Sequence, residues 1–307
     1  MYKSLILLLA VLPGLAVQAA EPLPPETGQA WLQRWLAAES RSYQGTFVYE
    51  RNGSFSTHAI WHRRDASGRV RERLLQLDGP AQEVVRVDAQ VQCMSNPQAA
   101  QPEPLAGLRR QQVLAEQLSA QYEVRLLGQS RVAGHAAVVL ALLPRDQYRY
   151  ALELHLDQQS GLLLKSLLLN GQGQLLERFQ FAQLDTRSPL NAAALQPSAA
   201  CLPVSMAPPE SSALALSSPW RAAWLPPGFS LSSVQQRGAQ GASQALTWLM
   251  FSDGLARFSL FIEVLPQTAV EDLQSQLGPT ISLSRQMPGV SGPVMLTLVG
   301  EVPLATA

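Results

Sequence analysis

The chain has 307 residues, of which 47% are hydrophobic and 15% are charged. This composition excludes a disordered chain, and the length predicts about two domains of ordinary size. Basic and acidic residues both number 23, so the net charge gives no indication of nucleic-acid binding or of a polybasic membrane anchor.

The first 19 residues have the features of a secretory signal peptide. Lys3 precedes an apolar run over residues 5–17, and small residues suitable for signal peptidase follow. The run is too short to span a bilayer, and no later segment approaches the ~18 apolar residues of a spanning helix. We therefore expect residues 1–19 to be removed and the mature chain to be exported into an oxidising compartment.

Residues 20–203 are expected to form a large antiparallel sheet with two helices. Trp31, Leu32, Trp35 and Leu36 make one apolar stripe on a helix over 26–41. Alternating apolar residues and turn signals such as Asn52-Gly53 predict the strands. The expected strands cover 43–51, 54–63, 69–77, 82–94, 122–132, 136–143, 148–157, 162–169 and 174–184, and the second helix covers 108–120. So long a sheet tends to curl toward a barrel, whose concave face the helix with two tryptophans would fill.

A smaller domain is expected at the C-terminus. Residues 185–203 are interpreted as a Pro-rich tail strapped onto the first domain, and residues 204–219 as a linker. Residues 220–307 predict strands over 229–235, 245–251, 256–265, 280–287 and 294–302, with a helix over 269–277. The predicted fold class is therefore α+β, mostly antiparallel β, with a large domain and a smaller C-terminal α+β domain.

The chain has two cysteines, Cys93 and Cys201. An even number of cysteines in an exported protein favours a disulfide. Cys201 also lies in the Pro-rich tail, which needs an anchor. The alternative is a pair of free buried thiols, but we expect the disulfide.

Recognised catalytic motifs are missing from the sequence. There is no G-x-S-x-G elbow, no Walker loop and no zincin helix. His58 and His62 fall in a predicted strand, where four residues separate them by ~13 Å, too far to share one ion. Packing or an exposed polar face is the expected role of these histidines. We expect no catalytic residues, no metal, no cofactor and no enzymatic activity.

The expected concave face of the large domain is apolar enough for an acyl chain. Each buried methylene group contributes ~0.8 kcal/mol, so a dozen carbons would contribute on the order of 10 kcal/mol before ordering costs. The side chains expected to line this cavity are Trp31, Trp35, Phe47, Tyr49, Tyr148, Tyr150, Phe179 and Phe181. The alternative is that the rings simply pack against the two tryptophans, and these residues leave both interpretations open.

Ordered blocks along nearly the whole mature chain resemble the MucB/RseB family. In the large domain they are Tyr43-Gln44-Gly45-Thr46-Phe47-Val48-Tyr49, Arg51-Asn52-Gly53-Ser54, Trp61-His62, Arg71-Glu72-Arg73-Leu74, Leu77-Asp78-Gly79, Gly161-Leu162, Lys165-Ser166 and Glu177-Arg178-Phe179. In the small domain they are Trp224-Leu225-Pro226-Pro227-Gly228-Phe229 and Ser252-Asp253-Gly254-Leu255. Blocks of this length and order are far more specific than any single motif.

The resemblance implies a periplasmic negative regulator of a sigma-E/AlgU envelope-stress response, which includes alginate regulation. Such proteins bind the periplasmic segment of a membrane-spanning anti-sigma factor, RseA or MucA, and shield it from the site-1 protease. Their large domain resembles the lipoprotein carriers LolA, LolB and LppX, an unclosed barrel with internal helices. The resemblance also implies release by lipid or lipopolysaccharide fragments and self-association, here expected as a dimer. We hypothesise that lipid displaces the helix that carries Trp31 and Trp35.

Partner contacts are expected in the matching part of the small domain. The candidates are Trp224, Phe229, Asp253, Arg257 and Phe258. Trp224 and Phe229 could instead be core residues, and Asp253 could serve only a hairpin turn. The sequence ends at Ala307, where relatives continue, so a further C-terminal helix is not expected. A periplasmic lipid or lipoprotein carrier is the alternative function, and an exported hydrolase ranks last because no nucleophile–base pair can be named.

Overall fold

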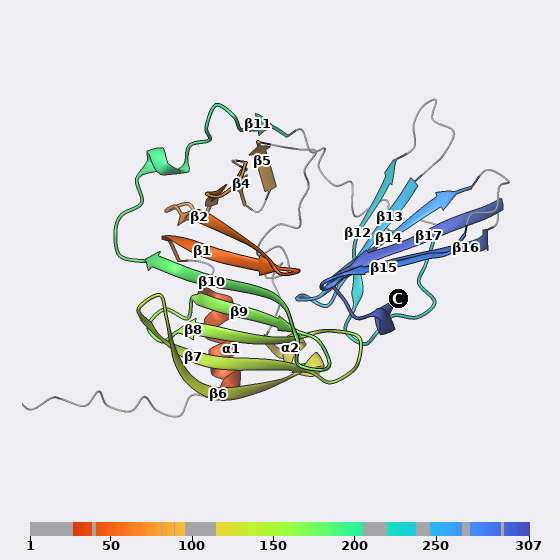
Figure 1. The fold of residues 1–307 in the computed structure, drawn as a ribbon, viewed down its shortest axis with the longest axis horizontal. Coiled ribbons are helices and arrows are strands. Elements are labelled where there is room, and N and C mark those ends of the chain that lie inside the picture. The colour runs from red at the N-terminus through yellow and green to blue at the C-terminus, as the bar shows by residue number, and fades with distance from the viewer. Residues whose placement is uncertain are drawn as a thin grey trace, which may run out of the picture.

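The computed structural model describes residues 27–38, 41–80, 82–88, 90–95, 115–204, 220–237, 246–265, 271–289 and 292–307. The predicted signal peptide, residues 205–219 of the predicted linker and the first part of the helix predicted over 108–120 lie outside the described residues. Figure 1 shows two sheets, one in a large domain (residues 27–204) and one in a small domain (residues 220–307). No helix in the described ranges is long and apolar enough to cross a membrane.

The large domain is an 11-stranded antiparallel sheet with the strand order β11-β5-β4-β3-β2-β1-β10-β9-β8-β7-β6. Because β11 and β6 are its two edges, the sheet is not closed, which confirms the predicted unclosed and mostly antiparallel architecture. The strands are β1 (Tyr43–Arg51), β2 (Ser54–Arg64), β3 (Val70–Gln76), β4 (Glu83–Val87), β5 (Gln90–Met94), β6 (Tyr122–Val132), β7 (His135–Pro144), β8 (Ala151–Asp157), β9 (Leu163–Leu169), β10 (Leu175–Asp185) and β11 (Leu202–Pro203).

Helix α1 (Gly28–Ala38) packs its two tryptophans against the sheet, as its apolar stripe predicts. Trp31 and Trp35 are buried among leucines of β7 and β8 and of helix α2 (Ala115–Gln121). Figure 1 shows α1 running across strands β6 to β9. Truncating a buried tryptophan to alanine typically costs about 3–5 kcal/mol, so α1 is firmly attached to this face.

A second core lies along β1 and β10, where aromatic rings pack on neighbouring strands. Phe47 is fully buried, with the Phe179 ring centroid at 4.7 Å and the Phe181 centroid at 5.9 Å. The ring of His58 stacks on Phe47 at 5.1 Å, and burial lowers the pKa of His58 to about 4. Aromatic pairs at these separations add to the stabilisation from apolar burial, so this half of the sheet is held by rings.

The Pro-rich tail returns along the large domain and is attached to its far edge. It carries the 3₁₀ helix η2 (Ala192–Leu195) and then β11, which pairs with β5. Cys93 and Cys201 form a disulfide with an S–S distance of 2.01 Å. Glu83 also accepts a hydrogen bond from the backbone N–H of Ser198 at 3.1 Å. The tail is therefore a strap held by a covalent bond and a buried carboxylate.

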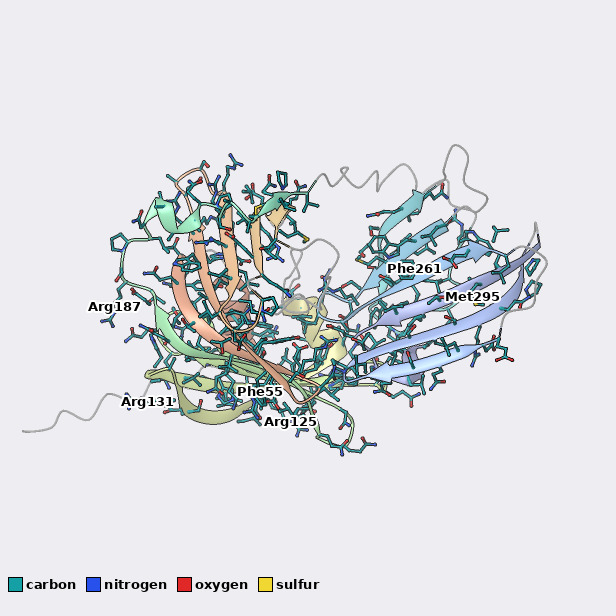
Figure 2. The ribbon with its side chains drawn as sticks, turned by 45° about the horizontal axis from the view of Figure 1, so that its top comes forward. Phe55, Arg125, Arg131, Arg187, Phe261 and Met295 are labelled. Atoms are coloured by element: carbon teal, nitrogen blue, oxygen red, sulfur yellow. A yellow bond between two sulfur atoms is a disulfide. The ribbon has the colours of Figure 1, made fainter. Side chains whose placement is uncertain are left out.

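The small domain is a six-stranded antiparallel sheet with the order β12-β13-β14-β17-β16-β15. Its core face includes Phe229, Leu249, Phe251, Phe258 and Ile262. On the opposite face Trp248 stacks on Phe261 at 5.7 Å, and Figure 2 shows Phe261 and Met295 on this sheet. The elements are β12 (Ser230–Arg237), β13 (Leu246–Ser252), β14 (Arg257–Val264), β15 (Leu273–Leu277), β16 (Thr280–Gly289), β17 (Gly292–Gly300) and the 3₁₀ helix η3 (Leu304–Thr306).

The helix predicted over 269–277 is wrong where the structure describes it. Residues 273–277 form strand β15, which pairs with β16, and residues 269–270 lie outside the described residues. Leu277 pairs with Thr280, so Gly278 and Pro279 make a two-residue turn. Residues 273–277 are extended because their backbone groups pair with β16. The local sequence pattern does not indicate this pairing.

The disulfide is expected to stabilise the fold through the long loop that it closes. The two cysteines are 108 residues apart, and the chain-entropy model gives about 5 kcal/mol for a loop of this length. We expect the Cys93→Ser/Cys201→Ser double variant to lose about 2–5 kcal/mol of unfolding free energy in urea denaturation. An unfolding midpoint equal to that of the native protein would contradict this expectation.

Candidate functional site between the two domains

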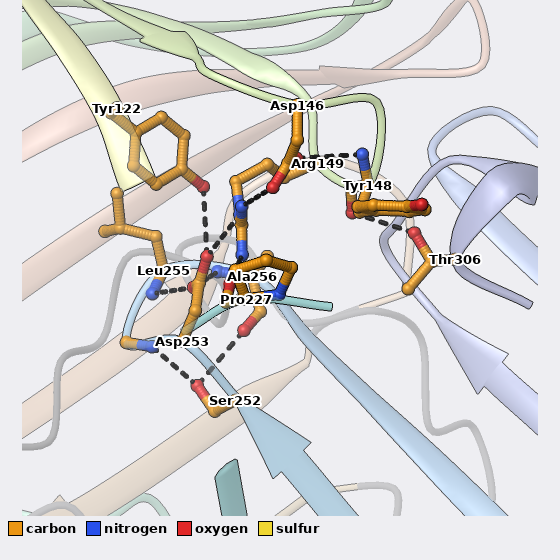
Figure 3. A network of polar contacts seen from close by, with 11 residues as sticks. Tyr122, Asp146, Tyr148, Arg149, Pro227, Ser252, Asp253, Leu255, Ala256 and Thr306 are labelled. Carbon is orange, nitrogen blue, oxygen red and sulfur yellow. Dashed lines mark hydrogen bonds and ion pairs between the residues drawn. The ribbon is translucent and has the colours of Figure 1, made fainter. Parts of the chain in front are cut away.

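Arg149 of the large domain binds the small domain through a buried ion pair (Figure 3). Its Nε donates to Oδ2 of Asp253 at 2.8 Å, and both side chains are 0% exposed. Its Nη2 donates to the carbonyl oxygen of Pro227 at 2.6 Å, and Asp146 of the large domain pairs with Nη1. The guanidinium therefore contacts two separate segments of the small domain.

Asp253 is oriented for this contact by the turn between β13 and β14. Its Oδ1 accepts backbone N–H groups of Leu255 at 2.9 Å and Ala256 at 2.7 Å, which leaves Oδ2 for Arg149. Tyr122 also directs its hydroxyl toward Oδ2 at 3.5 Å. Burial, followed by the negative charge of Asp253, raises the pKa of Tyr122, so the phenol stays protonated. One carboxylate thus both shapes the turn and joins the domains.

Aromatic side chains surround the Arg149 contact. The guanidinium carbon lies 5.0 Å from the ring centroid of Phe229 and 5.7 Å from that of Tyr122. Tyr148 makes an edge contact with Trp224 at 5.3 Å, and Trp224 remains 60% exposed. The strand predicted from residue 148 begins at Ala151, because the preceding residues contact the small domain.

Arg51 makes the second polar connection between the domains. Its Nη1 donates to Glu301 of the small domain at 2.7 Å and to Glu177 of the large domain at 3.0 Å, and Nη2 bonds Thr280. Tyr49 donates its hydroxyl to Glu177 at 2.8 Å. Burial, and then the charge of Glu301, raise the pKa of Glu177 to about 7. The hydrogen bond from Tyr49 and the charge of Arg51 lower this pKa, but by less.

Two glycines let the backbone of the small domain lie close to side chains of the large domain. Gly278 has φ +57°, and a Cβ there would lie 1.7 Å from Oδ1 of Asn52 in the β1–β2 turn. Gly228 has φ +84°, and a Cβ there would lie 2.6 Å from the side chain of Gln121. Positive φ and this crowding both disfavour any larger residue. The close fit of the domains therefore depends on these glycines.

A pocket lies between the two arginine contacts. Its cavity volume is about 40 Å³, and part of it is open to solvent. Its polar lining includes Tyr122, Tyr150, Glu177 and Glu301, and Leu168 and Leu255 supply apolar surface. Tyr150 donates its hydroxyl to the carbonyl oxygen of Val302 at 3.1 Å. Both domains contribute walls, so the shape of the pocket depends on how they dock.

The residues expected to line an acyl cavity are mostly packed in cores. Seven of the eight are buried: Trp31, Trp35, Phe47, Tyr49, Tyr150, Phe179 and Phe181. Tyr148 is half-buried at the domain interface, and Tyr150 lines the interdomain pocket. The two tryptophans belong to one core, and the rings of β1 and β10 belong to another. Helix α1 thus occupies the place expected for a lipid.

The five residues expected to contact a partner have different surroundings. Phe229 and Phe258 are in the core of the small domain, and Asp253 is paired with Arg149. Arg257 is half-buried, and Trp224 is exposed. Arg51 and Arg149 are not among the residues predicted from the sequence. A charged residue within an aromatic block, such as Arg149 between two tyrosines, was the available signal.

Four further histidine, serine and carboxylate contacts of the large sheet do not line the interdomain pocket. Oγ of Ser130 lies 2.7 Å from Nδ1 of His155, whose Nε2 lies 2.9 Å from Glu153. His62 pairs with Glu72 at 3.2 Å, and Nε2 of His58 lies 2.8 Å from Oγ of Ser56. In the described ranges, no three His, Cys, Asp or Glu side chains are grouped so as to hold a metal ion.

The fold and this interface define a two-domain β protein with an unclosed large sheet and a buried ionic connection to a second sheet. The model of the MucB/RseB N-terminal domain matches residues 27–199, and the model of the MucB/RseB C-terminal domain matches residues 215–307. The chain is 50% identical to the sigma factor AlgU regulatory protein MucB of Pseudomonas aeruginosa over 306 residues, which cover 99% of this chain and 94% of that protein.

Solved structures match both domains. The MucA/MucB complex of Pseudomonas aeruginosa matches with a TM-score of 0.79 and 51% identity, covering 91% of this chain and 95% of that chain. A structure of MucB alone matches with a TM-score of 0.67 and 49% identity, covering 91% and 94%. The chain therefore belongs to the MucB/RseB family, which confirms the resemblance seen in its sequence blocks.

The buried pair predicts that Asp253→Asn destabilises the protein much more than loss of an exposed pair. The amide keeps the turn acceptor but leaves the buried guanidinium with less negative charge, at a cost of about 3 kcal/mol. Glu123→Gln is the matched control, because Glu123 and Arg125 form an exposed pair at 2.7 Å. The control is expected to leave the midpoint of urea unfolding nearly unchanged. Equal losses in the two variants would contradict the role of Arg149 and Asp253.

Proposed function

We propose that this protein binds the periplasmic segment of a membrane anti-sigma factor of the MucA type. Binding shields the segment from the site-1 protease, so that the envelope-stress sigma factor stays inhibited. The observation that carries this proposal is the 50% identity to MucB over both domains, together with the TM-score of 0.79 to MucB in its complex with MucA. The protein acts as a regulatory binding protein and has no enzymatic role.

The periplasm is the proposed location. The N-terminal 19 residues suit export, and the Cys93–Cys201 disulfide suits an oxidising compartment. Self-association as a dimer belongs to the same proposal and rests on the family resemblance. An anti-sigma segment that is disordered before binding would order on the surface, which limits its net affinity per unit area.

Trp224 is the proposed partner contact of the small domain. Large, exposed aromatic side chains at interfaces often carry much of the binding free energy. Trp224 is 60% exposed yet supported at its edge by Tyr148, so its orientation is fixed from the large domain. Arg257 is the second proposed contact. The other three candidates support this surface without contacting the partner. Phe229 and Phe258 form the core beneath it, and Asp253 holds the adjacent turn.

Lipid or a lipopolysaccharide fragment is the proposed release signal. A ligand can loosen the complex only if it binds more tightly to the unbound arrangement. Helix α1 packs on the face that would hold acyl carbons, so lipid entry requires displacement of Trp31 and Trp35. The displaced helix would disturb α2, which belongs to the same core as Leu255 of the small domain. This core provides a contiguous route from the lipid face to the domain interface.

A periplasmic lipid or lipoprotein carrier of the LolA type is the second candidate function. The unclosed sheet with helices on its inner face favours it. The small domain and its buried ionic connection disfavour it, because a single-domain carrier needs neither. A pull-down with the periplasmic segment of MucA as one bait and a lipoprotein as the other separates the two candidates.

The anti-sigma proposal predicts protection of the segment against proteolysis. The mature protein is expected to slow cleavage of the Pseudomonas aeruginosa MucA periplasmic segment by the site-1 protease. Trp224→Ala is expected to weaken binding by at least about 2 kcal/mol, roughly thirtyfold, in isothermal titration. Leu127→Ala is the control, because Leu127 is exposed on β6. The affinity of this variant for the segment should stay within about threefold of that of the native protein. Absence of both binding and protection in the native protein would refute the proposed function.

The lipid route predicts that Trp31→Ala and Trp35→Ala change release more than basal binding. Each substitution loosens α1 from its sheet, so less lipid should be needed to release a bound MucA segment. Release is measured by fluorescence anisotropy of the labelled segment during titration with lipopolysaccharide. If both variants respond to lipid as the native protein does, displacement of α1 is not the route.

A further inference from the structure

The Arg51 contact brings two carboxylates from different domains to one cation. Glu177 belongs to β10 of the large domain, and Glu301 follows β17 of the small domain. Both accept from Nη1 of Arg51, at 3.0 Å and 2.7 Å. The side chains of Arg51, Glu177 and Glu301 are 8%, 16% and 26% exposed. The two acids thus share one guanidinium in a site with little water.

The charges at this site do not cancel when both acids are ionised. In the described part of the chain, neither carboxylate pairs with a second cation. The other groups that face them are neutral: Tyr49 donates to Glu177, Thr280 bonds Arg51, and Tyr122 and Tyr150 line the adjoining pocket. One excess negative charge therefore remains in a place of low polarity, where like charges repel strongly.

The excess charge exists only while the domains are docked. Undocking moves Glu301 away from Glu177 and opens the site to water, and both changes lower the pKa of Glu177 toward its ordinary value. In the docked arrangement burial and Glu301 raise the pKa of Glu177 to about 7 from 4.5. The docked form therefore binds a proton more tightly than the undocked form does.

We propose that proton uptake by the Glu177–Glu301 pair controls docking of the small domain on the large domain. Docking is tightest when Glu177 is protonated, and it loosens when Glu177 carries a negative charge beside Glu301. This inference deepens the proposed function, and its consequence for regulation rests on it. Since Trp224 is supported by Tyr148 across the same interface, loosening the interface also disorders the proposed partner surface.

The sign of the pH dependence follows from the linkage of proton binding to docking. The favourable contribution of the proton is complete below about pH 4.5 and is lost as pH rises through about 7. The docking equilibrium constant is expected to fall on the order of a hundredfold between pH 5 and pH 8. The buried Arg149–Asp253 pair holds the same interface at a separate place, so docking weakens without being abolished.

Two MucB structures differ in their overall similarity to this chain. This chain matches MucB in the complex with MucA at a TM-score of 0.79 and MucB alone at 0.67, with nearly equal coverage and identity. The two structures therefore differ in their similarity to the arrangement described for this chain.

Docking rather than unfolding should be measured. His58 and His155 are buried in the large domain, and burial lowers the pKa of each, which affects unfolding between about pH 4 and 6.5. Small-angle X-ray scattering of the mature full chain reports the domain arrangement directly. The radius of gyration is expected to increase from pH 5.5 to pH 8.5 with a midpoint near 7.

Glutamine variants identify the groups responsible. Glu177→Gln and Glu301→Gln each remove the repulsion but keep an acceptor for Arg51, so both should stay compact and lose the pH response. Glu263→Gln, an exposed carboxylate on β14, is the control that removes the same charge elsewhere and should behave as the native protein. A native radius that does not change with pH would overturn the proposal. So would a Glu177→Gln variant that keeps the native response.

A parallel titration separates this inference from the proposed function. The periplasmic segment of Pseudomonas aeruginosa MucA is titrated into the native protein and Glu177→Gln at pH 6 and pH 8. We expect binding to the native protein to weaken by about five- to tenfold between the two, since the linkage allows about tenfold at most, and binding to the variant to change less than threefold. Equal pH dependence of binding in the two proteins would overturn the coupling. A segment that binds neither protein at either pH would refute the proposed function and leave the scattering result standing.

Discussion

A buried guanidinium needs negative charge beside it, and this requirement organises the contact between the two domains. Arg149 loses its water when the domains dock, so Asp253 and Asp146 must lie within hydrogen-bonding distance. The turn that holds Asp253 is built by the same carboxylate, which accepts two backbone N–H groups. A change in the domain arrangement must therefore break a buried pair, and this makes the docked arrangement specific in geometry.

The second arginine connection differs from the first in how exposed its acids are. Each guanidinium lies beside two carboxylates. The Arg149–Asp253 pair is fully buried, whereas Glu177 and Glu301, which share Arg51, border a partly open pocket. The first contact gives the interface its position, and the second makes it responsive to its surroundings. A regulator that must hold and then release a polypeptide benefits from both properties, because a uniformly strong interface could not be shifted by a weak signal.

The position of α1 connects the fold to the proposed lipid response. The large sheet exposes an inner face of leucines that an unclosed sheet cannot cover with its own strands. Two tryptophans on one short helix cover that face, and the same core reaches α2 and Leu255 of the small domain. Apolar packing is non-directional, so another apolar occupant can replace α1 if its burial offsets the loss of the indoles.

Local patterns in the sequence determined the helix with two tryptophans, the antiparallel strands with their Asn-Gly and Asp-Gly turns, and the family to which the chain belongs. These features depend on residues close together in the chain, whose periodicity reports which face is buried. Only the tertiary structure decided which charged residues meet, since Arg149 and Asp253 are 104 residues apart and Arg51 and Glu301 are 250 apart. It also decided that residues 273–277 are a strand and that Phe229 and Phe258 are buried. Such contacts depend on how two sheets approach in space, and the free energy of a pair depends on the burial that this approach creates.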